Sequence, residues 1–441
     1  MDRKTVASAS TLLAVFLFLS VFLQAQQPQA NNSQAAGSQT TSSGSQPATL
    51  DDKLAAGDDD DPQPARKLVS WNEYHGKYFT VKMGGGFLYD YAAYAQDRAS
   101  KEQFALDATP ILRDTRVWFK GAFKFIKRPV TYTAAVMYDG ITSQFLVRET
   151  GVMIAVPELS GYIFVGRSKE GFSLNKIMVG YAGWTMERAT ISDATIPILA
   201  DGVKWLGYAP REHLLWNLGF FGDGLSEGQS FSTYDRQVVG RVAFLPLMSE
   251  ANGKVLHIGL NLRYGKPNNG TIQFRSRPEA FPAPYFMDTG KFPAKSSTIT
   301  DFEAYYRPGP LLIGTEYFLI DVNSPQKGNP FFHGGDAVVS WLPTGETRVY
   351  NTRGGFFNQI SPARPVFQGG PGAWELVARS SYSDLNSGAV RGGIFWRFTP
   401  MVNWHMSDNV RLEFAYGYGS LDRFNVAGKT QFFQTRVQLQ F

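Results

Sequence analysis

The chain has 441 residues, of which 43% are hydrophobic, 18% charged and 14% aromatic, with 44 Gly, 24 Pro and no Cys. A mean hydropathy of −0.21 excludes a bundle of membrane-spanning helices, because each such helix needs about 20 consecutive apolar residues. The lack of Cys excludes disulfides, thiolate metal sites and a Cys nucleophile.

The formal net charge of +5 is unevenly distributed. The first 70 residues carry five basic and seven acidic side chains, so the 38 basic and 31 acidic side chains that follow give the rest of the chain a charge of +7. No block of Lys and Arg concentrates this excess. We therefore expect small anionic partners and no nucleic acid.

The first 69 residues are predicted to lie outside the folded domain. Residues 1–25 have a basic start, an apolar stretch from Leu12 to Leu23 and a small residue at Ala25, which is typical of a secretory signal peptide. Residues 26–69 begin with a low-complexity tract and include the acidic run Asp58 to Asp61, a composition that predicts a disordered tail. The folded domain is expected to span residues 70–441.

From Lys77 onwards the dominant hydrophobic period is two. In the last eight residues Gln434, Arg436, Gln438 and Gln440 alternate with Thr435, Val437, Leu439 and Phe441. Roughly sixteen such segments of about ten residues are separated by alternating short and long connections, the pattern of a transmembrane β-barrel. Lipid offers no partner to an open strand edge, so the sheet must close. The sequence predicts an all-β, antiparallel barrel of about 16 strands in the outer membrane of a diderm bacterium.

Three stretches resemble the phosphate-selective porin O and P family. The first is Gly166 to Leu174 with Trp184 to Ala189, the second is Gly372 to Arg379 with Ser383 to Asn386, and the third is Val402 to Leu412. The resemblance implies sixteen strands, a homotrimer and a constricted anion pathway lined by Arg and Lys. It leaves the preference for phosphate over other small inorganic anions open.

Strand parity identifies candidate pore-lining cations, because a pore that favours anions needs lumenal cations that bind them weakly. Arg116, Lys120 and Lys124 share one face of their strand, opposite Val117 and Phe119. Further cations fall on the polar sides of other strands, namely Arg241, Arg263, Arg379, Arg397, Arg411 and Arg436.

Some of these cations are expected to brace the wall instead. Glu413 lies two residues from Arg411 and Glu375 lies four from Arg379, so those two pairs are predicted to be structural.

Residues 169–211 separate two expected strands by about forty residues, which suggests a loop that folds inward and narrows the pore. Lys169 and Arg188 are the candidates for the constriction, whereas Glu187 is expected to pin the loop to the wall.

Other chemistry finds little support in the sequence. The five His residues are dispersed and lie in no nucleophile motif, so no enzyme is predicted. Gly84 to Gly86 lacks the Lys of a phosphate loop, and no cofactor or metal is predicted. The remaining partners are outer-membrane lipid and the barrel-assembly machinery, which would recognise Phe441. The alternative to conduction is a non-conducting structural or adhesive barrel.

Overall fold

The computed structural model describes residues 72–178, 180–197, 199–222, 234–249 and 253–441. The predicted signal peptide and tail lie outside the described residues. Within them, no helix combines the length and apolar character needed to cross a bilayer.

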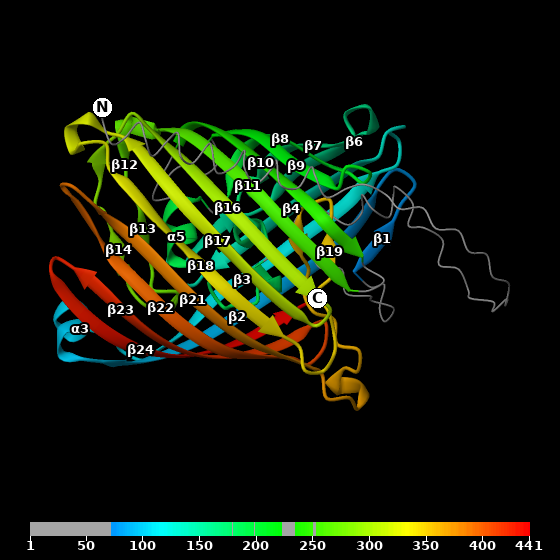
Figure 1. The fold of residues 1–441 in the computed structure, drawn as a ribbon. Coiled ribbons are helices and arrows are strands. Elements are labelled where there is room, and N and C mark those ends of the chain that lie inside the picture. The colour runs from blue at the N-terminus through cyan, green and yellow to red at the C-terminus, as the bar shows by residue number, and fades with distance from the viewer. Residues whose placement is uncertain (1–71, 179, 198, 223–233, 250–252) are drawn as a thin grey trace, which may run out of the picture. The chain divides into compact units, whose positions relative to one another are not determined.

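The described strands form one closed antiparallel barrel of sixteen wall positions (Figure 1). The wall is built, in chain order, from β2 (Thr80–Gln96), β3 (Thr109–Phe123), β4 (Val130–Asp139), β5 (Gln144–Val147) continued by β6 (Thr150–Val156), β7 (Gly161–Ser168), β8 (Ala200–Ala209), β9 (Leu214–Gly222), β10 (Tyr234–Ser249), β11 (Lys254–Pro267), β16 (Ser296–Pro308), β17 (Leu311–Asn323), β18 (Phe331–Trp341), β21 (Ala373–Ser387), β22 (Val390–His405), β23 (Val410–Arg423) and β24 (Val426–Gln440). The predicted fold class and strand number are confirmed.

The barrel closes between its first and last wall strands. β24 pairs with β2 from Gly86 opposite Gln440 to Gln96 opposite Thr430. Phe441 continues the seam, because its backbone N–H and C=O exchange 3.0 Å hydrogen bonds with Gly85. Every wall strand therefore has a hydrogen-bonded neighbour on both sides, as hydrocarbon requires.

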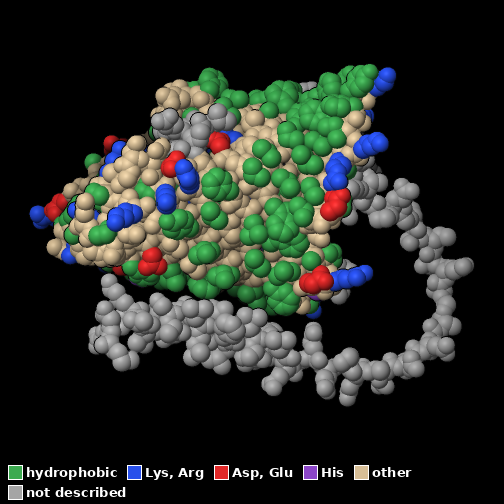
Figure 2. All heavy atoms as spheres, turned by 90° about the horizontal axis from the view of Figure 1, so that it is seen from above, with side chains coloured by type: hydrophobic (Ala, Val, Ile, Leu, Met, Phe, Trp, Pro, Cys, Tyr) green, Lys and Arg blue, Asp and Glu red, His purple; other side chains and the backbone are tan. Residues whose placement is uncertain are grey.

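Alternation along each strand separates a lipid face from a lumenal face. On β10, Val238, Val242 and Phe244 are 55%, 43% and 42% exposed on the outside, whereas Arg241 is fully buried on the inside. Figure 2 shows hydrophobic side chains over the middle of the outer wall, with most charged ones toward the two ends. Aromatic pairs such as Trp374 and Trp404, stacked at 5.0 Å, lie on this outer face. Such a surface suits an apolar band flanked by aromatic girdles.

Three long connections enter the barrel. The β7–β8 loop (169–199) carries α4 (Leu174–Ile177) and α5 (Thr190–Thr195), and the β11–β16 loop (268–295) carries β12 (Thr271–Ile272), β13 (Arg275–Ser276), β14 (Met287–Asp288) and β15 (Phe292–Pro293). The β18–β21 loop (342–372) carries β19 (Tyr350–Asn351) and β20 (Phe356–Phe357). In an up-and-down barrel the first two loops start from the end opposite Phe441 and the third starts from the Phe441 end, as Figure 1 shows.

The remaining short elements are β1 (Glu73–His75), which pairs with β2, α3 (Arg98–Gln103), and single 3-10 turns at Pro157–Leu159, Asn268–Gly270, Pro325–Lys327 and Val366–Gln368. A further 3-10 turn, Gly180–Ala182, belongs to the inward β7–β8 loop.

The inward loops pack into the lumen through apolar side chains. One cluster joins Phe172 and Ile191 of the β7–β8 loop to Phe274 and Phe286 of the β11–β16 loop and to Phe432 of the wall. A second joins Trp184, Tyr305 and Phe357, which come from one loop, the wall and another loop. The interior is therefore partly filled by protein.

One expected boundary is wrong. The predicted loop from Lys169 to Arg211 ends at Leu199, because Ala200–Ala209 forms wall strand β8. Apolar residues occur on both faces of β8, with Val203 outside and Leu206 buried inside. Because the two faces of β8 differ little in hydrophobicity, the sequence pattern did not reveal this strand.

We expect a charge on the lipid face to destabilise the barrel according to depth. Leu260→Arg, in the middle of β11 and outward facing, should lower the free energy of unfolding by about 2–4 kcal/mol. Tyr264→Arg, nearer the strand end on the same face, should lower it by about 0–1 kcal/mol. Urea unfolding in lipid vesicles measures both, and equal losses would contradict the assigned membrane band.

Candidate ion pathway

The predicted cations of β3 lie on its inner side or just beyond its end. Arg116 and Lys120 point inward, and Val117 and Phe119, each 42% exposed, point to lipid. Lys124 follows the end of β3 and is exposed at the Phe441 end. The strand thus carries positive charge from its middle to the barrel mouth.

Neighbouring groups hold these cations in place. The Arg116 guanidinium lies 4.9 Å from the centre of the Tyr181 ring, and its Nη2 is 2.5 Å from Oδ2 of Asp114. Lys120 lies opposite Lys82 of β2 and over the Trp118 ring at 5.2 Å. The Lys82 and Arg116 side chains stay 23% and 13% exposed.

A β-bulge adds Arg113 to the same wall. In the β2–β3 register Leu88 faces Asp114 and Tyr89 faces Leu112, so Arg113 has no partner position in the ladder. Such an extra residue re-aims its side chain, and Arg113 pairs with Glu187 of the β7–β8 loop inside the barrel. Strict alternation places Arg113 on the lipid side, so the sequence analysis missed it.

More cations gather where the β7–β8 loop begins. Lys169 donates from Nζ to the carbonyl oxygens of Ile177 and Met178 at 3.2 and 3.0 Å. Arg148 lies at the break between β5 and β6 beside Glu149, 3.4 Å away. Glu149 also interacts electrostatically with Arg116 and Lys169. One carboxylate is therefore surrounded by three cations.

Four other predicted arginines face inward and bind the loops. Arg241, Arg263, Arg397 and Arg436 are only 0–3% exposed. Each donates at 2.6–2.7 Å to an acceptor inside the barrel, namely Glu303, Glu170, the Pro278 carbonyl oxygen and Asp90, in that order. Arg241 and Arg397 also donate to carbonyl groups of the β18–β21 and β11–β16 loops. Strand parity placed them on the correct face, and their contacts tie loops to the wall.

The predicted braces divide into one correct and one wrong pair. Arg411 and Glu413 lie 3.2 Å apart, as predicted. Arg379 instead pairs with Glu279 of the β11–β16 loop. Glu375 pairs instead with Arg348. Neither partner could be predicted from the strand pattern, because Arg348 and Glu279 lie on loops whose paths that pattern does not reveal.

Glu187 and Arg188 have different tasks within the β7–β8 loop. Glu187 bonds to Arg113 and Arg436, at 3.1 and 2.6 Å, and so attaches the loop to β3 and β24. Arg188 donates to carbonyl oxygens of the same loop, at Asn175 and Met178. Arg188 therefore shapes the loop from within.

The electrostatics of Glu187 follow from these contacts. Burial alone would raise its pKa, but Arg113 and Arg436 lower the pKa of Glu187 to about 2. The carboxylate therefore stays ionised through the physiological pH range.

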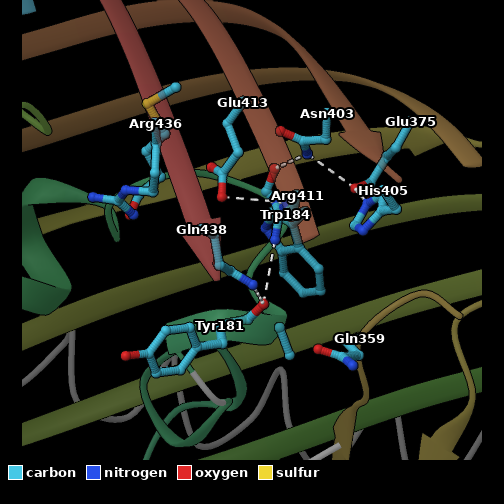
Figure 3. Close-up of polar contacts among 12 residues, drawn as sticks. Tyr181, Trp184, Gln359, Glu375, Asn403, His405, Arg411, Glu413, Arg436 and Gln438 are labelled. Atoms are coloured by element: carbon cyan, nitrogen blue, oxygen red, sulfur yellow. Dashed lines mark hydrogen bonds and ion pairs between the residues drawn. The ribbon is translucent and has the colours of Figure 1, made fainter. Parts of the chain in front are cut away.

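The middle of the β7–β8 loop is hydrogen-bonded to the β22–β24 wall (Figure 3). Asn403 donates to the Trp184 carbonyl oxygen at 2.9 Å, and Gln438 donates to the Tyr181 carbonyl oxygen at 3.0 Å. Arg411 adds a 3.4 Å bond to the same Tyr181 oxygen. Wall side chains thus satisfy backbone groups that a loop in a lumen would otherwise leave to water.

The β18–β21 loop meets the β7–β8 loop near this point. Arg348 forms a bidentate pair with Glu375, at 2.7 and 2.9 Å, and donates to the Ala182 carbonyl oxygen at 2.7 Å. Glu375 also accepts from Asn403 and contacts His405. Loops from opposite barrel ends therefore meet at Arg348, which bonds to Ala182 of the β7–β8 loop and forms a buried ion pair with Glu375 of wall strand β21.

A closed barrel with a polar interior, inward loops and an apolar outer wall defines an outer-membrane porin. Comparison with known proteins refines this class, because the phosphate-selective porin O and P family matches residues 81–441. The chain belongs to the phosphate-selective porin O and P family.

One curated relative and several solved structures are similar. The chain is 27% identical over 307 residues to an uncharacterized protein of Caulobacter vibrioides, covering 63% of the chain and 59% of that protein. An anion-selective porin from Comamonas acidovorans matches with a TM-score of 0.50 and 11% identity, covering 82% of this chain and 100% of that one. OmpF of Salmonella typhi, in complex with daunomycin, matches with 0.52 and 10%, covering 84% and 100%. These structures share the fold, and membership of the porin family places the protein in the outer membrane.

We expect removal of Arg348 to destabilise the protein strongly. Arg348→Met leaves Glu375 buried without its cation, which should lower the free energy of unfolding by about 3–5 kcal/mol. Urea titration in detergent measures the loss. Arg364→Met, an exposed arginine in the same loop, is the matched control, and equal stability of the two variants would contradict the role of the pair.

The depressed pKa of Glu187 predicts how acid affects the β7–β8 loop. A carboxylate with a lowered folded pKa stabilises fully above its ordinary pKa of 4.5 and loses that effect as pH falls toward 2. Hydrogen exchange in the loop, corrected for intrinsic rates, should stay slow down to about pH 4.5 and accelerate below it.

Glu187→Gln should accelerate this exchange already at pH 7. Glu158→Gln, which removes an exposed carboxylate at another connection, should not. Unchanged exchange in Glu187→Gln would show that the loop is held by other contacts.

Proposed function

We propose that this porin passes small anions passively, along the part of its lumen lined by β2 and β3. One observation carries the proposal: apart from Lys120, the cations of this wall stay partly exposed, while Arg241, Arg263, Arg397 and Arg436 elsewhere in the lumen are buried in loop contacts. Running from the Phe441 end, the cations of the β2–β3 wall are Lys124, Lys120, Lys82, Arg116 and Arg113. The family name and the anion-selective porin from Comamonas acidovorans support the same assignment.

The charge balance around this wall favours anions. The inward cations Arg113, Arg116, Lys120, Arg148, Lys169 and Lys204 outnumber the nearby carboxylates of Asp114, Glu149 and Glu187, while Asp90 of β2 is paired with Arg436 of β24. Such an excess raises the local anion concentration. Because the cations are spread along the wall, an anion meets several weak sites and can move on.

The candidates from the sequence take two roles. Arg116, Lys120, Lys124 and Lys169 belong to the anion pathway. Arg188 supports the β7–β8 loop, and the deeply buried set Arg241, Arg263, Arg397 and Arg436 anchors loops. Inorganic anions, phosphate among them, are the proposed substrates, and the protein performs no chemical turnover and needs no cofactor.

The proposed assembly rests on another part of the barrel, the wall of β7, β8 and β9. β7, β8 and β9 have 8, 10 and 9 residues, whereas β10 has 16. Because β7, β8 and β9 are short, this part of the barrel is best covered by another protein subunit. We therefore propose a homotrimer in which the subunits contact one another through these strands. Apart from the β18–β21 loop, the connections at the Phe441 end are short, so we propose that this end faces the periplasm. The 42% exposed Phe441 ring is the proposed signal to the barrel-assembly machinery.

We expect reversal of the charge on β3 to reverse the selectivity. Lys120→Glu with Lys124→Glu changes the pathway by four charges, so the zero-current potential in a KCl gradient should change from anion- to cation-selective. Planar-bilayer recording measures it.

The matched control is Lys101→Glu with Lys429→Glu, which makes the same charge change at exposed positions outside the lumen. The control should keep anion selectivity. Unchanged selectivity in the β3 variant would remove these lysines from the pathway, and no conductance from the folded parent barrel would favour the non-conducting alternative.

A further inference from the structure

The mouth opposite Phe441 contains an alternating stack of arginines and aromatic rings. The Arg113 guanidinium lies 3.5 Å from the centre of the Phe281 ring, and Arg277 lies 5.5 Å from the same ring. Arg277 also lies 4.6 Å from the Tyr285 ring, and Arg275 lies 4.3 Å from it. We call these five side chains the mouth stack. Four of its members lie on the β11–β16 loop, and the fifth, Arg113, lies on β3.

The mouth stack is not what attaches the loop. Phe274 and Phe286 of the same loop are 0% and 2% exposed and pack in the apolar cluster of the interior. Glu279 binds Arg379, and the Pro278 and Glu279 carbonyl groups accept from Arg397. All five members of the mouth stack, by contrast, are partly exposed. The loop therefore has its own buried anchors, and the stack faces the water of the mouth.

The charge of the stack is positive. Arg113 pairs with Glu187, which it shares with Arg436. Arg277 donates to the Ala283 carbonyl group. Arg275 lies opposite Asp288 in the β13–β14 register, and Oδ1 of Asp288 also accepts from Gln273 and the Gly290 amide. Three guanidinium groups thus stand beside two carboxylates.

The geometry selects a ligand class. A guanidinium group stacked on a ring lies parallel to that ring, and its N–H groups point outward in its own plane. There they suit bidentate contact with a carboxylate or phosphate. The ring edges beside it favour apolar and aromatic contact. A bare inorganic anion uses only the first of these features. An anion with an attached aromatic ring uses both.

We propose that the mouth stack is a recognition site for small aromatic oxyanions, such as aryl phosphates and aryl carboxylates. This inference rests on the proposed anion pathway, because Arg113 passes the ligand to Arg116 three residues further along β3. The site gives the porin a preference among anions that its charge alone does not provide.

Current block by phenyl phosphate, methyl phosphate and inorganic phosphate tests the site. Each is added to the side opposite Phe441 during planar-bilayer recording in KCl. Ring contact with a guanidinium is worth about 0.5–2 kcal/mol, so phenyl phosphate should block at roughly tenfold lower concentration than the other two. Equal block by all three anions would overturn the proposal.

Two variants separate recognition from folding. Phe281→Leu with Tyr285→Leu should reduce the preference for phenyl phosphate to within about threefold and leave the zero-current potential unchanged. Phe145→Leu with Phe424→Leu, which removes exposed rings at the same mouth, should keep the preference. Arg277→Lys keeps the charge but loses the planar stack, and it should also lose the preference.

The outcomes distinguish this inference from the proposed function. A cation-selective zero-current potential in the parent protein would refute the anion pathway itself. Anion selectivity with no preference for the ring, or with a preference that survives Phe281→Leu with Tyr285→Leu and Arg277→Lys in folded barrels, would refute only the mouth stack.

Discussion

A strand in hydrocarbon must give all its backbone hydrogen bonds to neighbouring strands, and the rest of this structure depends on that constraint. It makes the sheet close, from β2 at the start to Phe441 at the end. Closure in turn fixes an inside and an outside for every strand, so that alternate residues meet lipid and lumen. The lumenal face carries charge because it alone has water and protein partners.

The lumen is asymmetric because the inward loops use its charges unequally. Loop and wall acceptors occupy the inward arginines Arg241, Arg263, Arg397 and Arg436, which are almost fully buried. Removing one member of such a buried pair is costly, since the other charge is left without compensation. On β2 and β3 the cations other than Lys120 stay partly exposed. Arginine therefore anchors loops at some lumenal positions and, in the proposed pathway, attracts anions at others.

The sequence could predict the features that depend on the alternation of hydrophobic and polar residues along each strand. Sixteen strands, the seam at Phe441 and the inward direction of Arg116 and Lys120 all follow from it. Arg113 escaped because a bulge breaks the period at that residue. β8 escaped because both of its faces carry apolar residues.

Loop contacts could not be predicted from local patterns. Arg379 finds its carboxylate 100 residues away at Glu279, on a loop that folds back into the barrel. Glu375 binds Arg348 for the same reason. Strand parity tells which way a side chain points, but the partner that it meets depends on the path of a loop with no repeating pattern.

The zero-current potential of the purified, folded barrel in a KCl gradient tests the central claim most directly. The exposed cations of the β2–β3 wall predict a potential of the sign that chloride permeation gives, with an amplitude that falls at high salt as the fixed charges are screened. A potential of the sign that potassium permeation gives would contradict the account, because positively charged side chains along the β2–β3 wall repel potassium ions.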